Sequence, residues 1–255
     1  MSSGKPFKDF LPPLLPEILD TLQEMNFATA TPVQGAVIPY FLSHKDINAS
    51  ACTGSGKTLS FLIPVFQILA KSESCNKPGE IGGIIISPTR ELAHQTFTVA
   101  QQFEQHLPQV HVVLLTGGNE IAEDLEQLQS DKTLLVIATP GRLKDVIDRQ
   151  GEKLAIRNLE VLILDEFTSM LDVSVRADVI NMILDLKEKY QTSIIFISHD
   201  ISVVRYVADR IAVMYAGRIV ETGTCAEIFY HPKHEYTKGL LESIPRLDST
   251  KHEKL

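Results

Sequence analysis

The segment ACTGSGKT, residues 51–58, has the residue types and spacing of a phosphate-binding loop. Small residues let successive backbone N–H groups converge on phosphate oxygens, and a following helix offers its N-terminus to the anion. In this pattern Lys57 reaches the β- and γ-phosphates of a nucleotide, and Thr58 ligates Mg²⁺. Ala51 stands where the general pattern has its first glycine, so the surrounding elements must support the assignment. The loop backbone would cradle the phosphates through Thr53, Gly54, Ser55 and Gly56.

The elements around this loop predict an α/β fold. The loop lies between an extended run over residues 46–50 and an apolar-periodic helix over 59–70. Further apolar runs predict strands at 81–87, 110–116, 133–139, 161–166 and 192–198. Helices are expected between and after them at 90–106, 119–129, 142–149, 174–190 and 203–208. Continuous β-branched strands that alternate with helices are typical of a parallel sheet covered on both faces.

We therefore expect a three-layer, doubly wound, mostly parallel sheet in one domain. Residues 210–223 predict a hairpin that turns at Ala216-Gly217, and a helical tail follows it.

Two strand ends carry side chains that suit phosphate chemistry. Asp165 and Glu166 end one strand, where a carboxylate reaches a metal ion and the next one polarises the attacking water. Such a pair alone is typical of a solvated strand terminus, and the phosphate loop upstream favours the catalytic interpretation. His199 ends the next strand, at the carboxyl edge where such sheets bind ligands. We expect His199 to contact the γ-phosphate, with a structural hydrogen bond as the alternative.

The segment NFATATPVQ, residues 26–34, offers candidate adenine contacts. A glutamine amide such as that of Gln34 can pair with both N6 and N7 of adenine, and a ring such as that of Phe10 can stack on the base. Phe27 is a further aromatic candidate for the nucleotide. Taken alone, an isolated phenylalanine or glutamine is usually structural, so these assignments depend on the nearby phosphate loop.

Composition limits the possible partners. The 255 residues are 44% hydrophobic, and no run approaches the roughly 18 to 20 apolar residues of a membrane span. The first residues lack the apolar core of a signal peptide, so we expect a cytoplasmic protein without a membrane partner. Three isolated cysteines show no metal-ligand spacing and favour reduced thiols. A net charge of −8 disfavours a general grip on nucleic acid, so any RNA affinity should be weak and salt-sensitive.

From about residue 7 to 166 the sequence resembles the first RecA-like lobe of DEAD-box RNA helicases. NFATATPVQ resembles the adenine-reading Q motif with Phe10 as its upstream aromatic, ACTGSGKT resembles motif I, and PTRELAHQ resembles motif Ia. A glycine pair and TPGR follow in the family's order. In that family the last three groups hold the RNA backbone. The resemblance therefore implies RNA contacts from Pro88, Thr89, Arg90, Gly117, Gly118, Thr139 and Arg142.

From about residue 161 to 245 the sequence is similar instead to the C-terminal part of an ATP-binding cassette ATPase of the oligopeptide and dipeptide transporter type. DEFTSMLD resembles the end of that family's Walker B strand with its D-loop, and ISHD resembles its H-loop. RIAVMYAGRIVETG and the residues after it resemble its characteristic tail. Both families place a metal-binding aspartate and a catalytic glutamate on the shared strand. We interpret the chain as an engineered chimera in which segments 1–166 and 167–255 form one P-loop NTPase domain.

These resemblances imply an ATP-binding domain with slow, Mg²⁺-dependent hydrolysis. Strand unwinding should be absent because there is no second RecA-like lobe with its arginine finger. Transport coupling should be absent because the LSGGQ signature is missing. Two alternatives stay open: a weak single-stranded RNA-binding module and an inactive folded scaffold. The sequence leaves the oligomeric state open.

Overall fold

The computed structural model describes residues 4–43, 55–72, 79–151, 154, 156, 158–165, 180–181, 183–185, 194–197, 201–215 and 218–243. Several predicted features lie outside these ranges: the strand at 46–50, the chain from 166 to 179, and the hairpin turn at Ala216-Gly217. Of the helix expected at 174–190, residues 180–181 and 183–185 are described and are helical. No helix within the described ranges is both long enough and apolar enough to cross a membrane.

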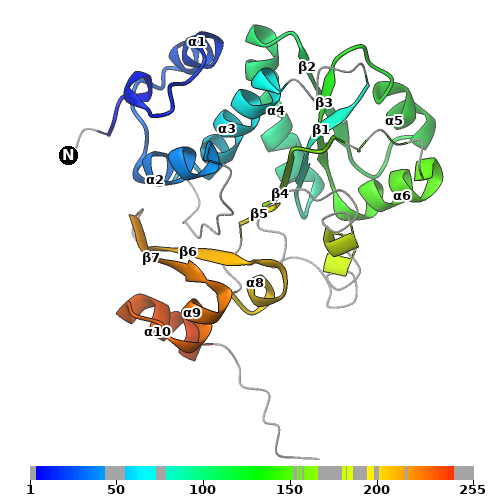
Figure 1. The fold of residues 1–255 in the computed structure, drawn as a ribbon. Helices are drawn as coiled ribbons and strands as arrows, with labels where there is room; N and C mark the ends of the chain where they lie inside the picture. Colours follow the sequence, from blue (N-terminus) through cyan, green and yellow to red (C-terminus); the bar gives the residue numbers. More distant parts are fainter. Residues whose placement is uncertain are drawn as a thin grey trace, which may run out of the picture.

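A five-stranded parallel sheet forms the centre of the molecule (Figure 1). Its strands lie in the order β2-β3-β1-β4-β5. Their bounds are β1 (Ile81–Ile86), β2 (Val110–Leu115), β3 (Thr133–Ala138), β4 (Val161–Asp165) and β5 (Ile194–Ile197). The order is not sequential, so each connection crosses over the sheet, as a doubly wound α/β fold requires. The predicted fold class is confirmed.

Alternate side chains of the strands enter two separate hydrophobic cores. In β4, Val161 and Ile163 face one core, and Leu162 and Leu164 face the other. The first core also contains residues of α1 (Pro16–Glu24), α2 (Pro32–Phe41), α3 (Lys57–Lys71) and α4 (Arg90–His106). The second contains residues of α6 (Pro140–Gln150) and α8 (Ile201–Val207), with α5 (Ile121–Gln127) packed against it. Two-sided burial explains why the strands read as continuous apolar runs.

Local capping sets the helix starts and corrects two expected boundaries. The helix predicted at 119–129 is α5, which begins at Ile121 because Asn119 pairs with Gly117 in an isolated bridge and Glu120 is extended. The helix predicted at 142–149 begins earlier, at Pro140, because proline at the first helical position has the required φ and needs no amide partner.

The C-terminal part of the chain adds an antiparallel hairpin and two short helices. The hairpin pairs β6 (Arg210–Tyr215) with β7 (Arg218–Thr224), and α9 (Cys225–Tyr230) and α10 (Glu235–Glu242) follow. Met214 of β6 lies in the first core and Val213 in the second. Helix α2 packs against β7. Both cores therefore contain residues from each of the two segments that the sequence distinguishes.

Candidate functional site

The described end of the phosphate loop leads directly into α3. Gly56 has a φ of +88°, in the left-handed region, and α3 begins at the next residue, Lys57. A Cβ on Gly56 would lie 2.5 Å from Nε2 of Gln34, so only glycine fits here. The hydroxyl of Ser55 is buried and has no hydrogen-bond partner within the described residues. A helix N-terminus with an unpaired buried hydroxyl before it suits an anion.

Gln34 lies against this loop rather than in open solvent. Its side chain is buried, with 3% of the residue exposed. Its Oε1 accepts a hydrogen bond from the Thr31 amide at 2.9 Å, and its Nε2 donates to the Gly56 carbonyl at 3.1 Å. The Thr31 hydroxyl in turn accepts from the Gln34 amide, which completes a capping box at the start of α2. Gln34 therefore joins the predicted adenine-binding segment to the phosphate loop.

Asp165 ends β4 as a buried carboxylate, with 4% of the residue exposed. Burial raises the pKa of Asp165 from its ordinary value of 3.8 to about 6, and the positive charge of Lys57 opposes part of this rise. Lys57 therefore lies close enough to Asp165 for its charge to lower the pKa of that carboxyl, and the half-buried Thr58 directly follows Lys57 in the sequence.

The hydroxyl of Thr58 and the carboxylate of Asp165 are ligands that suit magnesium. Within the described residues, no group of three or more His, Cys, Asp or Glu side chains could hold a metal ion. Mg²⁺ usually binds through one or two protein oxygens, substrate phosphates and water, which fits a hydroxyl and one carboxylate. Four predicted site residues lie outside the described ranges: Thr53, Gly54, Glu166 and His199.

The aromatic side chains near α1 correct one expectation. Phe10 is 1% exposed, its ring stacks on Phe7 with 5.7 Å between centroids, and Lys5 Nζ lies 5.0 Å from its centroid. Because its faces are covered, Phe10 has no surface to offer a base. Phe27 is 44% exposed instead.

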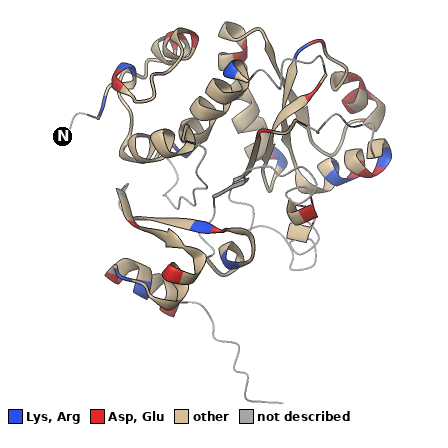
Figure 2. Cartoon of the chain, in the orientation of Figure 1, with Lys and Arg blue, Asp and Glu red and all other residues tan. Residues whose placement is uncertain are grey.

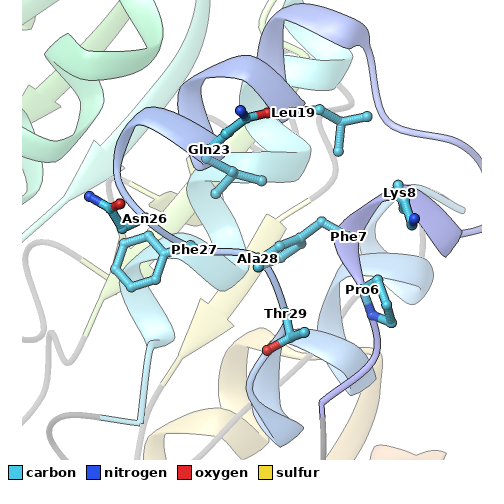
Figure 3. A pocket seen from close by; sticks show the side chains of 10 residues that line it. Pro6, Phe7, Lys8, Leu19, Gln23, Asn26, Phe27, Ala28 and Thr29 are labelled. Carbon is cyan, nitrogen blue, oxygen red and sulfur yellow. The ribbon is translucent and has the colours of Figure 1, made fainter.

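Phe27 lines a cavity of about 680 Å³ between η1 (Phe7–Asp9), α1 and the segment 26–29 (Figure 3). Figure 3 shows Asn26 and Phe27 side by side at one end of this cavity. Phe27 is therefore the candidate aromatic whose ring a ligand can reach.

A second cluster of predicted residues lies at the carboxyl ends of β1, β2 and β3. Arg90, exposed at the start of α4, lies across the loop after β2. A Cβ on Gly117 or on Gly118 would come within 3.0 Å of its guanidinium, and Gly118 has a φ of +115°. The two glycines thus allow Arg90 to approach the loop backbone closely.

The other predicted RNA contacts take mixed roles. Thr89 caps α4 by accepting the Leu92 amide at 3.2 Å, and Pro88 is buried. Thr139 precedes α6, and its side chain makes no capping hydrogen bond. The guanidinium of Arg142 pairs with the carboxylate of Asp124 and donates to the Asn119 carbonyl at 2.9 Å.

Asp124 was missed from the sequence although a signal was present. Ile121, Asp124 and Leu128 are spaced i, i+3 and i+7, so the aspartate occupies an apolar face of the predicted helix. A charged residue at such a position indicates a buried ion pair.

Comparisons with known proteins identify families that match two parts of the chain. The DEAD/DEAH box helicase family matches residues 31–199, and the oligopeptide/dipeptide transporter C-terminal region matches residues 220–255. The chain is 44% identical over 189 residues to DEAD-box ATP-dependent RNA helicase 49 of Arabidopsis thaliana, covering 74% of this chain and 34% of the relative. It is 43% identical over 188 residues to ATP-dependent RNA helicase DDX55 of Homo sapiens, covering 72% and 31%. The chain therefore spans about a third of the length of these relatives.

Solved structures show the same fold. A structure of Mss116p bound to single-stranded RNA and AMP-PNP has a TM-score of 0.70 at 29% identity, covering 80% of this chain and 43% of that one. A DEAD box protein from the hyperthermophile Methanococcus jannaschii has a TM-score of 0.66 at 29% identity, covering 83% and 56%. Since the family match covers more than half of the chain, the protein belongs to the DEAD/DEAH box helicase family.

Proposed function

We propose that this chain is an ATP-binding domain with slow, Mg²⁺-dependent hydrolysis. The buried carboxylate of Asp165 beside Lys57, at the start of α3, carries this proposal. A buried carboxylate is unfavourable when ionised, and a bound cation relieves that cost. Thr58 and Asp165 would hold Mg²⁺, which neutralises charge on the β- and γ-phosphates. Lys57 would bind the same phosphates, and Glu166 and His199 are proposed for the attacking water and the γ-phosphate.

Adenine recognition rests on the remaining hydrogen-bonding capacity of Gln34. Within the residues that the structure describes, each polar atom of its side-chain amide has one protein partner, Thr31 for Oε1 and Gly56 for Nε2. A carbonyl oxygen has two lone pairs and an amide nitrogen has two hydrogens, so one acceptor and one donor are left. Adenine offers a donor at N6 and an acceptor at N7, which match that pair. Phe27, at the rim of the cavity, would stack on the base.

We expect slow turnover by these 255 residues alone, without unwinding or transport. In related phosphoryl transfers, an arginine supplied from outside the phosphate site raises the rate of hydrolysis on the order of 10³- to 10⁵-fold. The two family matches within one chain support the interpretation of two segments in a single P-loop domain of engineered origin.

A thermal melt with and without Mg²⁺-ATP tests the proposal. Ligand at a hundred times Kd adds about 2.7 kcal/mol to the free energy of unfolding, which raises the midpoint by several degrees. We expect Lys57→Ala to abolish this rise. Lys71→Ala removes the same charge from the other end of α3 and should leave the rise intact. An unchanged rise in Lys57→Ala would show that nucleotide does not bind at this loop.

A second candidate function is weak binding of single-stranded RNA. The exposed guanidinium of Arg90, held over the Gly117-Gly118 backbone, favours it because guanidinium and backbone amides suit phosphate. Labelled oligouridylate at low salt should bind the parent chain and bind Arg90→Ala more weakly. No binding by the parent chain would end this candidate.

A further inference from the structure

One polar side chain lies buried in the second half of the helix that follows the phosphate loop. Between its terminal lysines, α3 carries no charged residue, as Figure 2 shows in the orientation of Figure 1. Gln67 of this helix is 2% exposed. A buried amide is costly unless its oxygen and its nitrogen are both hydrogen-bonded. The partners of Gln67 therefore show what this side chain holds in place.

Both partners of the Gln67 amide are backbone groups in the segment that joins η1 to α1. Its Oε1 accepts a hydrogen bond from the Leu15 amide at 2.8 Å, and its Nε2 donates to the Pro13 carbonyl at 2.9 Å. Leu15 directly precedes α1, and its side chain makes no capping hydrogen bond to that helix. Gln67 therefore fixes the start of α1 against α3.

The two elements that this segment joins are walls of the cavity shown in Figure 3. Phe7 of η1 lies in one wall, and Leu19 of α1 lies in another. The third wall, residues 26–29, is attached to the chain before η1, because the Ala30 amide donates to the Lys5 carbonyl at 2.8 Å. The chain is thus held before η1 by this attachment and after η1 by Gln67. The separation of the cavity walls depends on both.

We propose that Gln67 is a positioning residue for base recognition: it holds η1 and α1 at the separation that admits a purine base beside Phe27, and it takes no part in phosphate binding. The inference rests on the proposed ATP-binding function. The hydrogen bonds of Gln67 go to residues 13–15 and not to the first turn of α3, where Lys57 lies. Loss of Gln67 should therefore weaken contacts to the base and spare those to the phosphates.

Gln67→Met tests this role. Methionine has a similar length but no hydrogen-bond donor and only a weak acceptor, so it fills the same space without holding residues 13–15. Val65→Ala is the matched control, because Val65 is buried on the same helix and faces β1 beside Gly83. This control removes packing from α3 and keeps both hydrogen bonds of Gln67.

Titrations with Mg²⁺-ATP and Mg²⁺-tripolyphosphate separate the base from the phosphates, since tripolyphosphate has neither base nor sugar. In Gln67→Met we expect the affinity for ATP to fall about tenfold, the effect of losing about one hydrogen bond to the base. The affinity for tripolyphosphate should stay within about twofold. Deuterium uptake by residues 5–10 should become faster. Val65→Ala should lower the melting temperature and keep both affinities, which is also the pattern that a purely structural role of Gln67 would give.

Gly4→Ala disturbs the attachment before η1 and leaves Gln67 intact. A Cβ on Gly4 would lie 2.1 Å from the Ala30 carbonyl oxygen, so alanine must move the chain before η1 away from its neighbour. We expect weaker binding of ATP and unchanged binding of tripolyphosphate, as in Gln67→Met. Gly4 lies outside both hydrophobic cores, so this variant should fold even if Gln67→Met does not. Unchanged ATP affinity in Gly4→Ala would show that the wall separation does not control base recognition, which overturns the proposal.

The remaining outcomes are distinguishable. Unchanged ATP affinity in folded Gln67→Met overturns the positioning role. Equal losses for ATP and tripolyphosphate also overturn it, because Gln67 would then act on the phosphate loop through α3. A parent chain that binds neither ligand rejects the proposed ATP-binding function. In that case, faster exchange of residues 5–10 in Gln67→Met still supports Gln67 as the residue that holds the cavity wall, and unchanged exchange rejects that role as well.

Discussion

Two buried carboxylates of this molecule lie in opposite electrostatic situations. Asp124 has no exposed surface and pairs with the guanidinium of Arg142. Asp165 is also buried, yet its burial outweighs the attraction of Lys57, so its pKa rises to about 6. The protein itself supplies the counter-charge of Asp124, through Arg142. For Asp165 it leaves a cost that a bound cation would remove.

This difference distinguishes a buried charge that stabilises the fold from one that takes part in ligand binding. A buried charge paired with an oppositely charged side chain is part of the scaffold, and removing the partner is costly. A buried charge whose pKa shifts toward the neutral form points to a ligand site. Both residues lie near motifs that the sequence identifies, and only their surroundings tell them apart.

The largest expected effect on stability comes from Asp124, the carboxylate that is paired within the protein. Asp124→Asn should lower the free energy of unfolding by about 3 to 5 kcal/mol, because it leaves the Arg142 charge buried without its partner. Urea denaturation measures this. The Asp124→Asn/Arg142→Gln double variant should lose less than the sum of the single variants. Additive losses would mean that the two side chains do not act as a pair.

The next effect has the opposite sign and depends on pH. The folded state keeps the proton on Asp165 up to about pH 6, whereas the unfolded chain loses it near 3.8. The resulting cost is absent below about pH 4, grows between pH 4 and 6, and reaches roughly 3 kcal/mol above pH 6. Asp165→Asn should therefore stabilise the nucleotide-free protein at pH 8 by up to that amount, and barely change it at pH 4.

Denaturation of Asp165→Asn at both pH values measures this difference. Destabilisation at pH 8, as expected for Asp124→Asn, would place Asp165 among the structural charges instead. Mg²⁺-ATP should lose its stabilising effect in Asp165→Asn, which ties the apo-state cost to the ligand.

The sequence predicted the sheet more closely than the side chains around it. The strands expected at 81–87, 110–116 and 133–139 differ from β1 to β3 by one residue at their carboxyl ends, and β4 matches the described part, 161–165, of the strand expected at 161–166. A strand buried on both faces needs a continuous apolar run, and that signal is local. The helix at 90–106 matches α4 because its threonine cap and apolar periodicity are also local.

Site geometry was less predictable because it depends on contacts between distant segments. Phe10 was expected to stack on adenine, but Phe7 and Lys5 cover its ring. Arg142 stays a predicted RNA contact, and its pairing with Asp124, eighteen residues away, was not foreseen from the sequence. A motif gives the residue type, and tertiary packing decides which side chains stay available.

A smaller effect on stability tests the close approach of Arg90 to the Gly117-Gly118 loop and leaves the Asp124–Arg142 ion pair intact. Gly118→Ala should cost about 1 to 3 kcal/mol, because a φ of +115° is strained for alanine and its Cβ would crowd Arg90. Gly141→Ala is the control, since a Cβ there meets nothing within 4 Å and alanine favours the helix by up to about 1 kcal/mol. Thermal melts compare the two variants. Equal stability of the two variants would show that the loop accommodates a side chain at residue 118 and does not require glycine there.

The last effect is on nucleotide preference and sharpens the nucleotide side of the comparison. Gln34→Glu keeps an oxygen that can accept from the Thr31 amide, so the capping box of α2 survives. It loses the donor to the Gly56 carbonyl and the donor for adenine N7. Because this side chain is buried, an ionised carboxylate there costs further stability, so nucleotide preference is compared within each variant.

GTP presents O6 where ATP presents its N6 amino group, so the Gln34 amide should favour ATP in the parent chain. We expect ATP to raise the melting temperature more than GTP in the parent, and equally little in Gln34→Glu. Gln34→Ala should show the same loss of preference with a further loss of stability from the broken cap. If Gln34→Glu still prefers ATP, then Gln34 holds the phosphate loop but does not read the base, and the adenine must be recognised from the Phe27 cavity alone.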